Sequence, residues 1–145
     1  MPQIKSSYLG DLRTEAFHLK SANRVITDAP TDNHGRGEAF SPTDLVCASL
    51  CSCMMTIMGI RASKHDITLE GLEADITKHM SSAPRQIARI EIAFRLMHTN
   101  ATEEQRAMLK DAALHCPVAL SLNPAIKQEI TFDFWVATTS PIWKS

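Results

Sequence analysis

Apolar positions along the chain follow two spacings, one typical of strands and one typical of helices. Residues 1–29 alternate weakly between polar and apolar side chains, which predicts three strands. Turn residues at 9–11 and 21–23 separate these strands, so that the third covers residues 24–28. Residues 29–40 contain one proline and two glycines and predict a loop.

The longest apolar stretch follows this loop and predicts a helix. Ser41 is suited to the N-cap, Pro42 to the first helical position and Asp44 to the acid of a capping box. Residues 45–60 carry no charge, but they are fewer than the roughly 20 residues of a membrane span and include several polar side chains. We therefore expect a helix of a soluble protein that runs to about Ser63 and is buried nearly all round.

Three further strands are predicted in the second half of the chain. Residues 67–80 favour a strand with an irregularity at Gly71, and residues 81–84 favour a hairpin turn. Residues 87–98 alternate clearly between apolar and polar or charged side chains, which is typical of a strand with one buried face. Residues 129–137 repeat this period and predict the last strand.

A second helix is predicted before the last strand. Thr102 is suited to its N-cap, Gln105 completes a capping box, and Pro117 should end or break the helix near Cys116. Because helices and strands are segregated into runs, we predict an α+β fold with antiparallel sheets. A helix that is apolar all round needs more cover than one small sheet and one further helix provide. We therefore also expect a homodimer that shares the long central helices.

Length and composition indicate one globular domain covering residues 1–145, with a mass of 16.1 kDa. The chain has 15 Lys and Arg against 16 Asp and Glu and shows no basic stripe, which argues against a nucleic-acid partner. The N-terminus shows no secretory signal. Three of the four cysteines crowd into seven residues, which is a poor disulfide framework. We expect a cytoplasmic protein with reduced thiols and no membrane partner.

The cysteines, an arginine and a few nearby acids are the residues that indicate chemistry. Motifs of phosphate-binding loops, zinc proteases and serine hydrolases are missing, and the six histidines are scattered. Cys47 and Cys51 are one helical turn apart, whereas Cys53 is turned by about 200° from Cys51. Zinc sites usually use ligands from loops, so we expect neither a metal nor a cofactor. For Cys47 and Cys51, the favoured interpretation is that of small buried apolar side chains.

Two stretches resemble the OsmC/Ohr family, which includes osmotically inducible and organic hydroperoxide resistance proteins. Residues 41–57, SPTDLVCASLCSCMMTI, resemble the family segment S-P-[TY]-[ED]-L-L-x-A-A-L-G-[AST]-C-x-x-M-T. Residues 112–120, AALHCPVAL, resemble its second-cysteine motif, x-A-x-x-C-P-[VY]-x-x. The order of predicted elements agrees as well. The resemblance implies an OsmC-like fold, an intertwined homodimer with two central helices packed between sheets that both chains build, and active sites at the subunit interface.

The resemblance also implies a reaction. The peroxide-reacting cysteine of the family falls on Cys53, and its resolving cysteine falls on Cys116. A Cys53 thiolate would attack an organic hydroperoxide and release the alcohol, and the resulting sulfenic acid would form a disulfide with Cys116. An external dithiol, in the family often a dihydrolipoyl protein, would then reduce this disulfide. The protein is accordingly expected to be a cofactor-free thiol peroxidase.

Peroxidase members also supply an arginine from the N-terminal hairpin, held by a glutamate near the start of the central helix. Arg13 is the preferred position here, and Arg36 is the competitor. Thr43 stands where the glutamate is expected, so Asp44, one position further on, is the candidate catalytic acid. Asp44 could instead serve only in the capping box, and Glu38 is a further candidate for the acid.

Two other functions stay open at this stage. The substitution at Thr43 is compatible with a non-enzymatic OsmC-like homodimer that binds a small apolar ligand at the dimer interface. The crowded cysteines are compatible with a redox sensor, although the sequence contains no DNA-binding module for one.

Overall fold

The structure, a computed structural model, describes residues 1–136. Internal contacts divide the chain into two units, Met1–Val46 and Cys47–Ser145. Each unit contains one three-stranded sheet, and the long helix α1 (Pro42–Ser63) crosses the boundary between the units. The expectation of a single domain over residues 1–145 stays a prediction.

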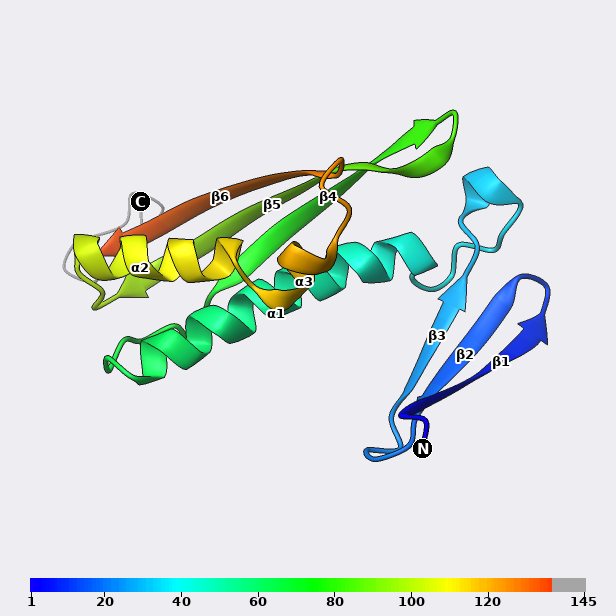
Figure 1. Cartoon of the computed structure of the whole chain (residues 1–145), viewed down its shortest axis with the longest axis horizontal. Coiled ribbons are helices and arrows are strands. Elements are labelled where there is room, and N and C mark those ends of the chain that lie inside the picture. Colours follow the sequence, from blue (N-terminus) through cyan, green and yellow to red (C-terminus); the bar gives the residue numbers. More distant parts are fainter. Residues whose placement is uncertain (137–145) are drawn as a thin grey trace, which may run out of the picture. The chain divides into compact units, whose positions relative to one another are not determined.

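The N-terminal unit confirms all three predicted strands, β1 (Ile4–Gly10), β2 (Arg13–His18) and β3 (Arg24–Asp28). They form an antiparallel sheet in the order β1-β2-β3 (Figure 1). Gly10 pairs with Arg13, so the first hairpin turns over two residues, Asp11 and Leu12, both with positive φ. Turns of this kind suit hairpins because their twist matches that of the strands.

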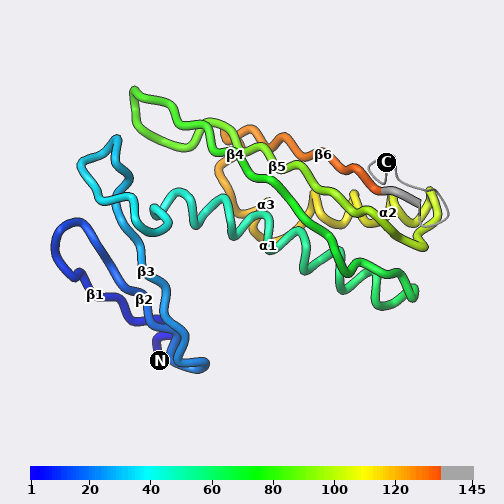
Figure 2. The backbone as a smooth tube through the Cα atoms, turned by 180° about the vertical axis from the view of Figure 1, so that it is seen from behind, coloured from blue at the N-terminus to red at the C-terminus, as the bar shows by residue number. Residues whose placement is uncertain are grey.

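The C-terminal unit builds its sheet from β4 (Glu73–Ser82), β5 (Arg85–Thr99) and β6 (Lys127–Val136). β4 and β5 are antiparallel, whereas β5 and β6 are parallel. The prediction of purely antiparallel sheets was therefore wrong. Parallel neighbours need a crossover connection, and here α2 (Glu103–Leu114) and α3 (Pro117–Ser121) provide it, as the tube in Figure 2 shows.

Several predicted strand boundaries differ from the structure. β4 ends at Ser82 and β5 spans Arg85–Thr99, so both run slightly beyond their predicted ranges at the hairpin. The strand expected from residue 67 begins at Glu73, because Glu70 and Gly71 form a turn in which Gly71 adopts a φ of +94°. The predicted last strand began at residue 129, but β6 begins at Lys127; its predicted end at Ala137 lies outside the described residues. The hairpin turn over residues 81–84 is confirmed, since Ser82 pairs directly with Arg85.

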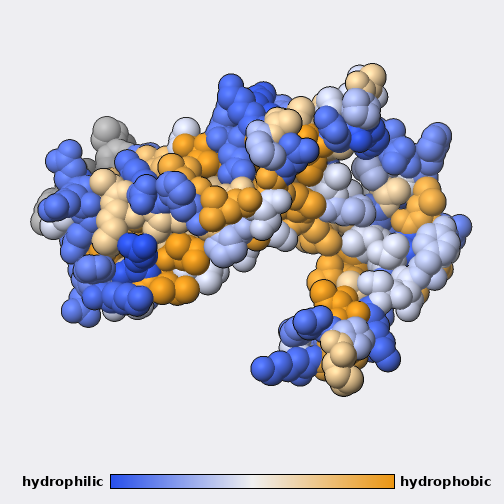
Figure 3. All heavy atoms as spheres, in the orientation of Figure 1, coloured by the Kyte–Doolittle hydropathy of each residue, from blue (hydrophilic) through white to orange (hydrophobic). Residues whose placement is uncertain are grey.

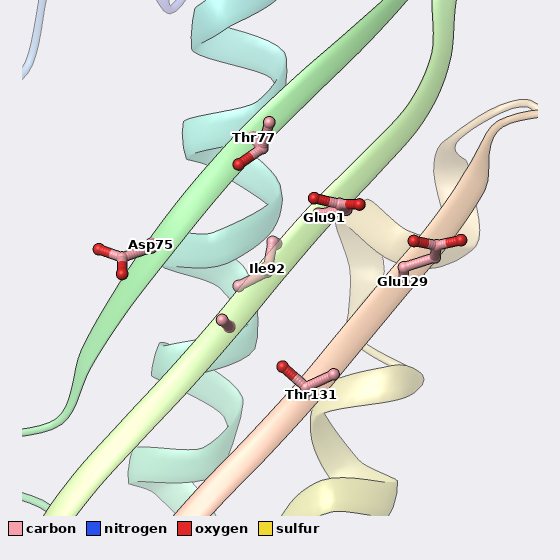
Figure 4. A pocket seen from close by; sticks show the side chains of 7 residues that line it. Asp75, Thr77, Glu91, Ile92, Glu129 and Thr131 are labelled. Carbon is pink, nitrogen blue, oxygen red and sulfur yellow. The ribbon is translucent and has the colours of Figure 1, made fainter.

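The core of the C-terminal unit lies on one face of its sheet. The helices α1, α2 and α3 run along this face (Figures 1 and 4). The alternating side chains predicted to be buried on β5 are at most 1% exposed, namely Ile90, Ile92, Phe94 and Leu96. Leu50, Met54 and Met58 of α1 and Leu109 of α2 are fully buried as well. Burial of each such side chain contributes about 1.5–3 kcal/mol.

The helix α1 confirms its predicted bounds but not its predicted burial. Its buried residues form one stripe at helical spacing: Cys47, Leu50, Cys51, Met54, Met58 and Ala62. Away from this stripe, Ile60 is 48% exposed. Burial nearly all round was therefore a wrong expectation for the single chain, because the sheet covers only one side of the helix. By length and apolar composition alone, α1 could also cross a membrane. The absence of a membrane partner and the cytoplasmic location stay predictions.

Candidate functional site

Two cysteines that lie far apart in the sequence meet in the C-terminal unit. Cys53 is half-buried on α1, and Cys116 is fully buried at the N-cap of α3. The two thiols lie close enough for Cys53 to raise the pKa of Cys116. The structure therefore brings together the two residues that the resemblance paired, although it records them as free thiols.

The surroundings of Cys116 favour its neutral thiol. Burial raises the pKa of this thiol, and the nearby thiol of Cys53 raises it further. The backbone N–H of Ala119 donates to the Cys116 Sγ at 3.5 Å, which partly offsets the increase. Of the two residues, Cys53 is the more exposed.

The other two cysteines belong to the buried stripe of α1. Cys47 and Cys51 are 2% and 5% exposed, and burial raises the pKa of the Cys51 thiol. These positions fit the interpretation of small apolar side chains. Within the part of the chain that the structure describes, there is no group of three or more His, Cys, Asp or Glu side chains that could hold a metal ion.

In the N-terminal unit, Arg13 is hydrogen-bonded to the carboxylate of Asp28, a residue that the sequence did not indicate as part of the site. Its Nε and Nη2 donate to Oδ1 and Oδ2 of Asp28, both at 2.7 Å, and Nη2 also donates to Glu38 Oε1 at 3.2 Å. The Asp28 side chain is fully buried, and its hydrogen bonds from Arg13 lower the pKa of its carboxyl group. Glu38, the further candidate for the acid, is confirmed as a contact of Arg13.

The competing arginine has a different environment. Arg36 Nη2 lies 3.6 Å from the highly exposed Asp11 carboxylate. An exposed ion pair of this kind contributes little and is screened by salt. The contrast with the buried partner of Arg13 favours Arg13 for the site, and this choice stays a prediction.

Asp44 forms the predicted capping box at the start of α1. Its Oδ2 accepts from the backbone N–H of Ser41 at 3.0 Å, and its own N–H donates to Ser41 Oγ at 3.0 Å. Thr43 lies between them, with its hydroxyl 3.2 Å from Ser41 Oγ. The capping role is therefore confirmed, while a catalytic role of Asp44 stays a prediction.

A separate depression of about 220 Å³ lies on the face of the C-terminal sheet opposite α1, α2 and α3 (Figure 4). Its lining residues come from all three strands and are mostly polar: Asp75, Thr77, Glu91, Ile92, Ala93, Glu129 and Thr131. The strands present the polar side chains of this set away from α1, whereas Cys53 belongs to α1 itself. This depression is not the thiol site.

Comparison with known proteins decides the family. The family model of OsmC-like proteins matches residues 35–131. The chain belongs to the OsmC-like family. This match includes Cys53 and Cys116 and confirms the resemblance that the two motifs indicated. No match is found among the curated proteins.

Solved structures agree with this assignment. A protein from Psychrobacter arcticus, named as a candidate osmotic stress induced and detoxification response protein, is 46% identical. The match covers 91% of this chain and 96% of that chain with a TM-score of 0.85. An OsmC-like protein from Mycoplasma pneumoniae shares the fold at 16% identity, with coverage of 91% and 95% and a TM-score of 0.75. An organic hydroperoxide resistance protein from Legionella pneumophila does so at 14% identity, with coverage of 92% and 98% and a TM-score of 0.66.

Proposed function

We propose that this OsmC-like protein is a cytoplasmic thiol peroxidase that reduces organic hydroperoxides to alcohols. The observation that carries the proposal is the contact between Cys53 and Cys116. A half-buried thiol that can meet a small molecule lies beside a fully buried thiol that can resolve its oxidised form. Membership in a family that includes organic hydroperoxide resistance proteins supports the same reaction.

The reaction proceeds in two steps at sulfur. The Cys53 thiolate attacks the terminal oxygen of the hydroperoxide, the O–O bond breaks, and the leaving alkoxide takes up a proton to become the alcohol. Cys53 is now a sulfenic acid. The Cys116 sulfur attacks the Cys53 sulfur, the S–O bond breaks, and water leaves with the Cys116 proton. An external dithiol then reduces the disulfide and is itself oxidised to a disulfide, so the cycle needs no metal or organic cofactor.

The first step requires a thiolate and a departing alkoxide, both of which a positive charge stabilises. We propose that Arg13 supplies this charge. Its guanidinium is 26% exposed and keeps a fixed orientation because a buried carboxylate holds it. Arg36, by contrast, has only an exposed ion-pair partner at 3.6 Å.

We also propose that the protein acts as a homodimer. The homodimer is supported by apolar side chains that are exposed on the helices of the C-terminal unit, where Figure 3 shows apolar surface. Ile60 on α1, Leu114 on α2 and Leu120 on α3 are 48%, 45% and 69% exposed. A second copy would remove such surface from water. Light scattering on the purified protein should give twice the 16.1 kDa of one chain.

The experiment that tests the activity is intact-mass analysis after one equivalent of cumene hydroperoxide, with hydrogen peroxide in parallel. We expect rapid loss of two hydrogen atoms, mapped by peptide analysis to a Cys53–Cys116 disulfide and faster with the organic peroxide. Cys53→Ser should abolish this reaction. Cys51→Ala is the matched control, because it removes a neighbouring thiol of α1 and should leave the reaction intact. An inert wild type would instead favour the binding of a small apolar ligand.

A further inference from the structure

We propose that Asp28 is the positioning residue of this site, the carboxylate that fixes the guanidinium of Arg13 in its working orientation. This inference rests on the proposed function, because Arg13 is given its role there. It moves the task of holding the arginine from the start of α1, where the sequence predicted it, to the last residue of β3.

The sheet itself places the two residues together. Arg13 begins β2 and Asp28 ends β3, and the antiparallel register sets them directly opposite each other. Directly opposed side chains point to the same face of a sheet at close range. The pairing therefore follows from the backbone, and both nitrogen–oxygen distances of the two-pronged contact are 2.7 Å.

Asp28 is itself immobilised by further contacts. Its Oδ2 accepts a hydrogen bond from the backbone N–H of Glu38 at 3.2 Å, and its own N–H donates to the carbonyl of Phe40 at 3.0 Å. These bonds connect the strand to the loop before α1. A bidentate carboxylate fixes both the position and the plane of a guanidinium, and here the carboxylate is anchored on two sides.

Glu38 cannot fix the guanidinium of Arg13 in the same way. Its side chain is 66% exposed and meets Arg13 through one bond of 3.2 Å. Such a contact exchanges easily with water. Within residues 1–136, the side-chain hydrogen bonds of Arg13 use Nε and Nη2, which leaves Nη1 for a developing negative charge. Asp28 thus holds one edge of the guanidinium, and the other edge keeps a donor.

A double-mutant cycle separates this role from a merely structural one. The measured quantity is the rate constant for Cys53 oxidation by cumene hydroperoxide. We expect Arg13→Ala to lower it by about a hundredfold and Asp28→Asn by at least about tenfold. The double variant should be no slower than Arg13→Ala, because Asp28 acts only through Arg13. Glu15→Gln is the matched control, because it removes a carboxylate of the same sheet that pairs with Arg24, and its rate should stay within about twofold of the wild type.

Chemical rescue distinguishes a positioning role of Asp28 from a purely structural one. Free guanidinium should restore part of the lost rate in Arg13→Ala, because Asp28 can bind it in the vacated place. The same addition should do nothing for the double variant, which lacks the carboxylate. The melting temperature and the far-UV circular dichroism spectrum report whether each variant is folded.

Several results would overturn the inference. The first is an additive loss of rate in the double variant, and the second is equal rescue by guanidinium with and without Asp28. The third is a wild-type rate for Asp28→Asn beside a slow Arg13→Ala. Each of these results would leave the peroxidase activity in place. A wild type inert to peroxide would overturn the proposed function as well. Should Asp28→Asn fail to fold, Asp28→Glu, which keeps the charge but displaces it, must lower the peroxide rate while the variant still melts cooperatively; an unaffected peroxide rate would overturn the inference.

Discussion

The buried thiol of Cys116 lies close enough to the half-buried thiol of Cys53 for the interaction between them to raise the pKa of Cys116, although the hairpin β4–β5 and the helix α2 lie between them in the sequence. The contact arises because α1 and α3 lie on the same face of the C-terminal sheet (Figure 1). Pro117 starts α3 and leaves Cys116 at its N-cap, where the sulfur accepts a backbone N–H. The two sulfurs therefore differ in access while they remain in reach of each other.

This difference in access predicts the fate of Cys53 when its partner is removed. In Cys116→Ser, one equivalent of cumene hydroperoxide should still oxidise Cys53, at a rate within about threefold of the wild type. The sulfenic acid should then persist, because no second thiol condenses with it. Mass spectrometry with dimedone trapping should find a Cys53 adduct in place of a disulfide. A disulfide of Cys53 with Cys51 or Cys47 in this variant would contradict the assignment of the resolving cysteine.

The burial of the four thiols also predicts the order in which they react. Under native conditions, N-ethylmaleimide should modify Cys53 first, because Cys47, Cys51 and Cys116 are all buried. Burial also raises the pKa values of Cys51 and Cys116, which keeps both as poorly nucleophilic thiols. Time-resolved peptide mapping measures the order, and denatured protein, in which all four sites should react similarly, is the control. Early labelling of Cys51 would contradict the placement of α1.

The sequence predicted best those features that depend on local pattern. The alternation on β5 identified its buried face, and the box at Thr102 located the start of α2. Strand direction is not encoded in such a pattern, since a parallel and an antiparallel β6 show the same alternation. Ile67 and Leu69, which alternate with polar residues, also continue the period of a strand, although the backbone turns at Gly71.

The candidate site also contains residues that local sequence pattern predicts and a residue that it does not predict. Two motifs were enough to find the cysteine pair, because they are short and contiguous. Arg13 lies in neither motif, and its role, which the resemblance implied, stays a prediction. Asp28 carries no motif, and its role depends on being opposite Arg13 in the sheet. Only the register supplies that relationship, and one residue of slip would place the carboxylate on the other face.

The two possible roles of Asp44 can be separated by one substitution. Asp44→Asn keeps an oxygen that can accept the Ser41 N–H but removes the charge. We expect its peroxide rate to stay within about twofold of the wild type, because Asp28 and Glu38 already contact Arg13. Ser41→Ala, which removes the cap itself, should cost about 1 kcal/mol of unfolding free energy. Urea denaturation and stopped-flow kinetics measure the two effects, and a strongly reduced rate in a stable Asp44→Asn would assign the acid to catalysis.

Glu129 predicts how the stability of the C-terminal unit depends on pH. Its carboxylate accepts from Arg89 Nη1 at 2.7 Å and lies 3.0 Å from Lys127 Nζ, and these contacts lower the pKa of its carboxyl group. Since the folded-state pKa lies below the ordinary glutamate value of about 4.3, the stabilisation is complete above that pH. It is lost as the pH falls through the lower folded-state pKa.

Glu129→Gln should therefore be less stable than the wild type at pH 6, and the gap should close as the pH falls toward 3. Added salt should narrow the gap at pH 6, because all three side chains are partly exposed and their charges are screened. Glu70→Gln, in the exposed turn before β4, removes the same charge and is the matched control, for which we expect a smaller pH dependence. Urea unfolding across this pH range measures the difference. A constant gap between wild type and Glu129→Gln would show that the side chain stabilises the sheet through packing and not through its charge.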